Sequence, residues 1–242
     1  MAEQPLAGRR IVVTRPEAKP LAQELERLGA EVTIVPLIEI RPAEDRHALE
    51  DAVGSLESYD WVVLTSINGV SAIASGLAGL VAPTRVAAVG PVTADAIRSH
   101  GVVPAFVASR ASDGIAGGLG ELDGSRVLLP QADIADPHLA EELRGQGAEV
   151  DVVVAYRTVL VEPPMWWILP LRIADAVVLA SGSACRSLAA AGGAGSAALL
   201  VCIGPKTAKV AREVGLHVGL VADETTSDGI IRALVTQFGE ST

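Results

Sequence analysis

The chain has 242 residues, half of them hydrophobic, and a formal net charge of −10 at pH 7. This length suggests one large domain or two small ones, with enough apolar residues to form a proper core. The acidic balance argues against a nucleic-acid-binding protein, which normally carries a basic patch, but helix N-termini and a few cationic side chains can still bind a small anion.

Short runs of β-forming residues alternate with helical ones along the chain. The stretch RIVVTR at 10–15 predicts a strand, and 16–29 predicts a helix with one apolar face that ends at Gly29. Most later strands are continuously apolar, which is typical of a buried parallel sheet. The sequence therefore predicts an α/β fold with parallel sheets. The further expected strands are 31–40, 61–66, 85–90, 103–108, 126–130, 149–158, 175–181, 199–204 and 217–222.

Four blocks of the sequence occur twice, about 115 residues apart. A shift that is kept over four blocks indicates two homologous halves, each the size of a small doubly wound domain. Proline-bearing segments at 36–44 and 156–164 are candidate linkers, and a cleft between two such domains is the default ligand site. The matching blocks are 59–73 with 174–188, 86–108 with 200–222, 112–115 with 227–230, and 8–32 with 124–150.

Each half contains a strand that ends in Gly-Pro-x-Thr. Gly90 permits a tight turn, Pro91 suits the first position of a helix because no N–H is needed there, and Thr93 lies in the first turn. The Thr93 hydroxyl can face a ligand or bond locally, and the free N–H groups of that turn can bind an anion. The second copy, 204–207, adds the charge of Lys206 beside Thr207. One copy alone is compatible with a βα turn that binds nothing, whereas two copies favour a ligand-binding role.

A second pair of strand-to-helix turns carries hydroxyl and amide side chains. Thr65, Ser66 and Asn68 follow one strand, and Ser181 lies in the matching turn of the other half. No G-x-S-x-G motif is present there, and the four histidines lie outside these turns. We therefore expect neither a nucleophilic triad nor a metal site. No P-loop and no G-x-G-x-x-G follows a strand, which disfavours a nucleotide-binding enzyme.

Three further features have alternative explanations. Arg15 follows the first strand, where it can bind a carboxylate through two hydrogen bonds or form a surface ion pair. Tyr156, one of only two tyrosines, lies in a candidate linker and is either structural or faces the cleft. The apolar stretch PMWW at 164–167 is expected in core or lid packing.

The cysteines and the N-terminal residues indicate in which cellular compartment the protein is expected. Cys185 and Cys202 lie among apolar or small residues and lack metal-pair spacing, so we expect buried, unpaired side chains and a cytoplasmic protein. The stretch MAEQPLAGRR has no apolar segment typical of a signal peptide. No apolar run approaches the roughly 20 residues that a membrane-spanning helix needs.

Taken in order, these motifs resemble the uroporphyrinogen-III synthase family over almost the whole chain. The matching stretches are VVTRP, YDWVVLTSINGV, VAAVGPVTADAI, GAEVDVVVAYRT, DAVVLASGS, IGPKTA and TTSDGI. The resemblance implies two flavodoxin-like, doubly wound parallel-sheet domains joined by a two-stranded linker. By this resemblance one domain is discontinuous, comprising 1–38 and 160–242, the other comprises 43–154, and the linkers are 39–42 and 155–159.

The resemblance also implies an activity. The family cyclises the linear tetrapyrrole hydroxymethylbilane to uroporphyrinogen III, with inversion of ring D and loss of water and without a metal or organic cofactor. The substrate is a polycarboxylate, which suits turns that present N–H groups and hydroxyls. By this resemblance Tyr156 assists departure of the hydroxyl, and we expect a monomer with no nucleic-acid or membrane partner. The implied substrate-binding residues are Arg15, Thr65, Ser66, Asn68, Gly90, Thr93, Ser181, Lys206, Thr207, Thr225 and Thr226.

The chain departs from the family pattern at two turns. Ala180 precedes Ser181 where relatives often have Thr, and 130–132 reads Pro-Gln-Ala where many have Arg-Gly. A second hypothesis is a non-catalytic binding module whose two domains close on an anionic small molecule. The duplicated architecture itself is the support for that hypothesis.

Overall fold

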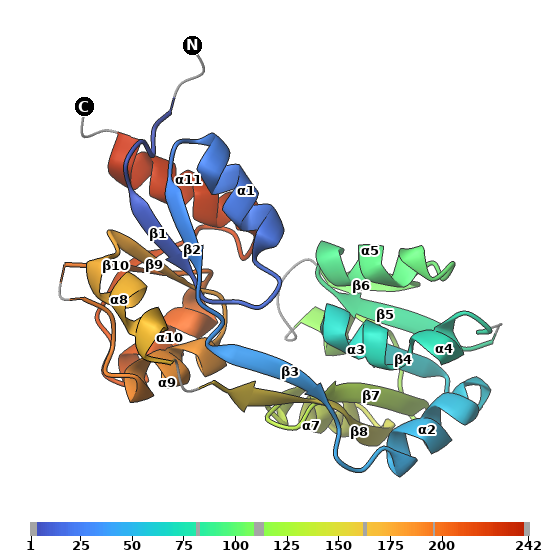
Figure 1. The fold of residues 1–242 in the computed structure, drawn as a ribbon. Helices are drawn as coiled ribbons and strands as arrows, with labels where there is room; N and C mark the ends of the chain where they lie inside the picture. Colours follow the sequence, from blue (N-terminus) through green and yellow to red (C-terminus); the bar gives the residue numbers. More distant parts are fainter. Residues whose placement is uncertain (1–3, 81–82, 109–113, 162–163, 196, 240–242) are drawn as a thin grey trace. The chain divides into compact units, whose positions relative to one another are not determined.

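The computed structural model describes residues 4–80, 83–108, 114–161, 164–195 and 197–239 (Figure 1). The chain forms two compact units, each with its own sheet and hydrophobic core. Unit 1 comprises Met1–Glu39 and Val159–Thr242, so it is built from both ends of the chain, and unit 2 comprises Ile40–Thr158. The first two residues of the SDGI motif at 112–115 lie outside the described residues.

Unit 1 has helices on both faces of a five-stranded parallel sheet. Its elements are β1 (Arg10–Val13), α1 (Lys19–Arg27), β2 (Glu31–Ile34), α8 (Met165–Ile173), β9 (Ala176–Leu179), α9 (Gly182–Ala190), β10 (Leu199–Cys202), α10 (Pro205–Glu213), β11 (Val218–Val221) and α11 (Ser227–Gly239). The strand order is β11-β10-β9-β1-β2, which is the flavodoxin-like order 2-1-3-4-5 when the strands are numbered along the chain. Alternate strand residues face opposite sides, so Val13 and Val178 pack with α1 and α11, whereas Val12 and Val177 pack with α8, α9 and α10.

Unit 2 has a six-stranded sheet, also covered on both faces. Its elements are β3 (Ile38–Pro42), α2 (His47–Gly54), the 3-10 helix η1 (Leu56–Ser58), β4 (Trp61–Leu64), α3 (Ile67–Ala72), α4 (Ala74–Leu77), β5 (Arg85–Val89), α5 (Pro91–Ser99), β6 (Phe106–Ala108), α6 (Ile115–Gly118), β7 (Arg126–Ala132), α7 (His138–Gly145) and β8 (Glu149–Leu160). The strand order is β3-β8-β7-β4-β5-β6, and β4 to β8 pair in parallel. Helices α2 to α5 cover one face, and α6 and α7 cover the other.

The two units repeat one structure, but the chain passes through the corresponding strands in a different order. The order β11-β10-β9-β1-β2 corresponds strand by strand to β6-β5-β4-β7-β8, as the sequence repeat requires. The registers also agree, because Arg10 pairs with Glu31 as Arg126 pairs with Glu149. Unit 2 has the additional strand β3 beside β8, at the position next to the counterpart of β2.

An aspartate before the central strand makes the same contacts in both units. Asp175 Oδ2 accepts a hydrogen bond from the Arg10 N–H at 2.8 Å, and Asp60 Oδ2 accepts one from the Arg126 N–H at 2.8 Å. The backbone N–H of each aspartate donates in turn to the carbonyl of the same arginine. The paired contacts align the two neighbouring strands at the amino edge of each sheet.

Each expected strand has a counterpart, but the expectation of one strand at 31–40 is wrong. That segment forms β2 and β3, which belong to different sheets. Pro36 lies between them and has no N–H to donate to a ladder, and the chain leaves one sheet for the other there. The expected helix at 16–29 is confirmed but begins only at Lys19.

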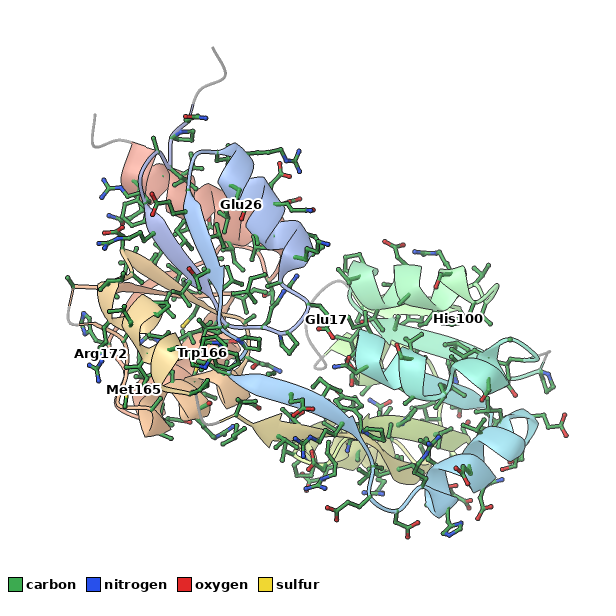
Figure 2. All side chains as sticks on the ribbon, in the orientation of Figure 1. Glu17, Glu26, His100, Met165, Trp166 and Arg172 are labelled. Atoms are coloured by element: carbon green, nitrogen blue, oxygen red, sulfur yellow. The ribbon has the colours of Figure 1, made fainter. Side chains whose placement is uncertain are left out.

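Of the two expectations for PMWW, core packing is wrong for Met165 and Trp166, whereas lid packing stays a prediction. Their exposed fractions are 81% and 69%, and both are labelled on α8 in Figure 2. Helix α8 turns Leu171 and the partly buried Trp167 toward the sheet, one helical turn apart, so that the other two side chains lie on the outer face.

Both cysteines are buried and unpaired, as predicted. Cys185 lies on α9 and Cys202 on β10, and both belong to the same hydrophobic cluster of unit 1. Within the described ranges, no helix combines the length and apolar character needed to cross a membrane. In the same ranges, no three His, Cys, Asp or Glu side chains gather into a possible metal site.

Candidate functional site

The candidate residues of unit 2 lie at the carboxyl edge of its sheet. Thr65 and Ser66 follow β4 directly, Gly90 follows β5, and Asn68 lies in the first turn of α3. Parallel strands have their carboxyl ends at one edge, where ligands bind in open α/β sheets. Tyr156 of β8 belongs to the same edge, because its hydroxyl lies 2.9 Å from Ser66 Oγ.

Ser66 joins the start of α3 to Tyr156. It is the N-cap of α3, with an extended backbone, and its Oγ accepts a hydrogen bond from the Gly69 N–H at 3.1 Å. A hydroxyl that accepts one hydrogen bond can still donate its proton or accept a second one, so the bond to the Tyr156 hydroxyl is compatible with the cap. The half-buried phenol is therefore held in a defined position by a residue 90 positions earlier in the chain.

The other tyrosine has a structural role. The Tyr59 hydroxyl donates to Asp151 Oδ2 at 2.9 Å, and the Arg126 guanidinium lies 4.7 Å from the centre of its ring. Burial and the neighbouring Asp151 carboxylate raise the pKa of Tyr59 above its ordinary value. Tyr156 is thus the tyrosine of the carboxyl edge.

An open pocket of about 300 Å³ adjoins Tyr156 within unit 2. Its lining residues come from β3, α2, α3 and β8 and from Arg46, which precedes α2. The combination of cationic, polar and apolar walls suits a flat ring that carries carboxylates. The polar lining residues are Arg41, Arg46, Asn68, Ser71 and Tyr156, and the apolar ones are Ile40, Pro42, Leu49, Ala72 and Ala155.

The sequence analysis missed Arg41 and Arg46. Arg41 lies in β3 and Arg46 precedes α2, in a stretch without a recognisable motif. Only the pairing of β3 with β8 brings this stretch beside Tyr156. Two isolated arginines give no local signal of a shared pocket, so sequence reasoning had no means of finding them.

The candidate residues of unit 1 also follow the carboxyl ends of strands. Arg15 follows β1, and its buried Nε has no hydrogen-bond partner among the described residues. Ser181 follows β9 and caps α9, accepting a hydrogen bond from the Ala184 N–H at 3.2 Å. Thr226 precedes α11 and accepts one from the Gly229 N–H at 3.0 Å. Ser181 and Thr226 therefore have structural roles at helix starts, whatever else they bind.

The two Gly-Pro-x-Thr turns need glycine for different reasons. Gly90 has φ +77°, a conformation that L side chains rarely adopt, and no atom of the described residues would lie within 4 Å of a Cβ there. Gly204 has an extended backbone with φ −178°, but a Cβ there would lie 2.7 Å from Thr225 Oγ1. The close approach places the predicted site residue Thr225 against the turn that also carries the predicted residues Lys206 and Thr207.

The threonines of these turns are largely covered. Thr93 and Thr207 have exposed fractions of 5% and 8%, whereas Lys206, which directly precedes Thr207, is exposed. Both helices begin at the proline, as predicted. The role of these side chains in binding a ligand stays a prediction.

The comparisons with known proteins agree with one another. The family model described as "Uroporphyrinogen-III synthase HemD" matches residues 19–232. The chain is 29% identical to the uroporphyrinogen-III synthase of Synechococcus elongatus, over 97% of each chain. It is also 29% identical to the porphyrin biosynthesis protein HemD of Ruminiclostridium josui, over 96% of its own length but only 49% of that protein.

Solved structures share the fold. A mutant uroporphyrinogen III synthase of Thermus thermophilus has a TM-score of 0.65 at 19% identity, over 95% of this chain and 99% of that chain. The synthetase of Helicobacter pylori has a TM-score of 0.63 at 16% identity, with the same coverage. At these identities the likeness shows the fold alone, but the family model spans most of the sequence. The chain therefore belongs to the uroporphyrinogen-III synthase family, whose members are enzymes of tetrapyrrole biosynthesis.

Proposed function

We propose that this chain converts hydroxymethylbilane to uroporphyrinogen III by ring closure with inversion of ring D and loss of water. The observation that supports this reaction best is the hydrogen bond between Tyr156 and Ser66 at the carboxyl edge of unit 2. It holds a proton donor beside a pocket with two arginines, which suits an acidic pyrrole substrate.

The reaction begins when the substrate hydroxyl leaves. Tyr156 donates its proton to that hydroxyl, which departs as water, and an electron-poor azafulvene remains on the first ring. The substituted carbon of ring D attacks this centre and forms a spiro intermediate. The bond between the spiro carbon and the methylene that joined ring D to ring C then breaks, and the other α-carbon of ring D bonds to that methylene. This carbon loses its proton, which returns to the Tyr156 phenolate, so that the net change is the loss of one water.

The enzyme must chiefly direct which carbon of ring D attacks, because closure without inversion gives a different isomer. Holding the reacting atoms in place is therefore the main contribution to catalysis. We propose that the remaining candidate residues bind substrate carboxylates and polar groups during this step. They are Arg15, Thr65, Ser66, Asn68, Gly90, Thr93, Ser181, Lys206, Thr207, Thr225 and Thr226.

The decisive experiment is an isomer assay. Purified protein is incubated with hydroxymethylbilane, the products are oxidised, and the uroporphyrin isomers are separated. We expect isomer III in excess of a protein-free control. Formation of isomer I alone, the spontaneous product, would contradict the proposed function, and tight substrate binding without isomer III would indicate the non-catalytic binding module.

Tyr156→Phe tests the assigned role of the phenol. Loss of a positioned proton donor should lower kcat by roughly 100-fold, the low end for general acid catalysis, because the hydroxyl also leaves unassisted. The substitution removes one half-buried oxygen, so the unfolding curve should change little. Unchanged turnover in a folded variant would show that Tyr156 does not assist the departure of the hydroxyl.

A further inference from the structure

We propose that the pocket beside Tyr156 binds one pyrrole ring of the substrate, with Arg41 and Arg46 holding the carboxylates of that ring. The inference rests on the proposed function, since it takes the substrate to be a linear polycarboxylate of pyrroles. It gives a role to two arginines that the sequence motifs leave without one.

The pocket wall has the chemistry that such a ring requires. Ile40, Leu49 and Ala155 provide apolar surface for the flat face of a pyrrole, and Arg41 and Arg46 line the same pocket. A guanidinium can bind a carboxylate through two parallel hydrogen bonds, which fixes orientation as well as position. The ring would thereby lie against the Tyr156 hydroxyl, where the proposed proton transfer occurs.

Three acidic side chains near the pocket have partners outside it. Glu44 and Asp133 form ion pairs with Arg157, and the Arg157 Nε to Asp133 Oδ2 distance is 3.7 Å. Asp45 Oδ1 accepts a hydrogen bond from the His47 N–H at 3.0 Å, at the start of α2. These acidic side chains therefore have positions in which they do not fill the pocket.

The ion pair of Arg46 is one that a substrate carboxylate can replace. Arg46 Nε lies 3.5 Å from Glu50 Oε1, and the two side chains are 58% and 59% exposed. Such exposed pairs contribute little to stability, because water screens both charges. A carboxylate that approaches from the pocket can form two hydrogen bonds to this guanidinium, whereas Glu50 forms an ion pair with it at 3.5 Å.

The helix before the central strand of unit 1 differs in its exposed side chains from the corresponding helix of unit 2. Helix α8 occupies there the place that α2 occupies in unit 2, since both precede the central strand of the sheet. It exposes Met165, Trp166 and Leu169 where α2 borders a pocket with arginines. Among the described residues, the pair of arginines beside the tyrosine is therefore a property of one copy of the repeat, as an asymmetric substrate requires.

The test compares Arg41→Gln, Arg46→Gln and the double variant with the wild type in the isomer assay. Arg98→Gln is the matched control, because Arg98 is also exposed and pairs along a helix with Asp95 at 2.6 Å. Each pocket variant should raise KM for hydroxymethylbilane about tenfold, and the double variant about 100-fold. We expect kcat to change less than about threefold, because these groups bind substrate and transition state alike.

Equal KM values for the double variant and the control would overturn the inference. If the glutamine variants do not fold, Arg41→Lys/Arg46→Lys decides, because lysine keeps the charge but not the paired hydrogen bonds. It should raise KM about tenfold, and a wild-type KM in that folded variant would equally overturn the inference.

A binding measurement separates this inference from the proposed function. Uroporphyrin III is the probe, and its fluorescence is titrated with each protein. Wild type and Arg98→Gln should bind it about 100-fold more tightly than the double variant, even if the wild type forms only isomer I. Equal affinities with normal isomer III formation would contradict the pocket assignment and leave the proposed function standing.

Discussion

Ser66 in unit 2 and Ser181 in unit 1 occupy the same turn of the same repeat. Both cap the helix that follows the central strand, with N–H to Oγ distances of 3.1 Å and 3.2 Å. Ser66 also contacts the Tyr156 hydroxyl. Tyr59, the other tyrosine of unit 2, is bound instead to Asp151. The duplicated fold thus keeps the helix start in both copies and adds a contact with a tyrosine hydroxyl in one of them.

The same contrast holds for the helix that precedes each central strand. Helix α2 begins beside Arg46 and borders the pocket, whereas α8 presents Met165 and Trp166 to its surroundings. The strand order and register of the two units nevertheless agree. The sheets therefore act as a common scaffold, and the differences in side chains at their edges distinguish the chemistry of the two copies.

The largest effect is expected in the cores, where the two units should behave alike. Leu64 ends β4, Leu179 ends β9, and both are fully buried. Leu64→Ala and Leu179→Ala should each lower the free energy of unfolding of their own unit by about 3 kcal/mol, because each leaves a cavity. Urea unfolding followed by circular dichroism measures this. If both variants shift one shared transition equally, the units do not unfold independently.

The two turn glycines should respond differently to alanine. Gly90→Ala should cost about 1–2 kcal/mol of stability, because the backbone conformation itself disfavours a side chain. Gly204→Ala should also destabilise, but through the clash with Thr225. Adding Thr225→Ala removes the atoms at 2.7 Å and 3.6 Å and leaves Cβ at 3.7 Å, an ordinary contact.

Thermal unfolding of the single and double variants measures that rescue. Thr225→Ala should restore stability to Gly204→Ala and should have no such effect on Gly90→Ala. If Thr225→Ala rescues neither variant, the close approach of Thr225 is not the reason for glycine at position 204.

The serine caps should differ in activity more than in stability. Ser66→Ala and Ser181→Ala should each cost about 1 kcal/mol, because each leaves a helix N–H without its acceptor. Ser66→Ala should also lower kcat about tenfold more than Ser181→Ala, because it releases the phenol of Tyr156. In the Tyr156→Phe background the additional loss of kcat should disappear, and its persistence would contradict a positioning role for Ser66.

The smallest effect concerns the aspartate contacts at the amino edge. Burial raises the pKa of Asp175, but hydrogen bonds and the charge from Arg10 outweigh it, so the pKa lies below its usual value. A carboxyl with a lowered folded pKa stabilises the protein above its unfolded pKa, and this stabilisation is lost as the pH falls through the folded pKa.

Asp175→Asn should therefore cost about 1 kcal/mol at neutral pH and progressively less below about pH 4. Urea unfolding of the variant and the wild type across this pH range provides the measurement. A difference that stays constant at low pH would show that the Asp175 charge does not contribute.

Local patterns in the sequence determined much of this protein. Continuous apolar runs predicted the parallel strands, and Gly-Pro predicted where α5 and α10 begin, because strand burial and helix starts depend on neighbouring residues. The repeated blocks predicted two similar halves. The buried cysteines also followed from their apolar neighbours.

Tertiary structure alone decided how distant segments combine. The break between β2 and β3, the contact of Ser66 with Tyr156 and the placing of Arg41 beside it all depend on sheet order. The glycines of the two Gly-Pro-x-Thr motifs have different backbone angles, with φ +77° at Gly90 and −178° at Gly204, where a Cβ would meet Thr225. Sequence periodicity specifies which face of an element is apolar. The residue that this face contacts depends on the order of the strands in the sheet.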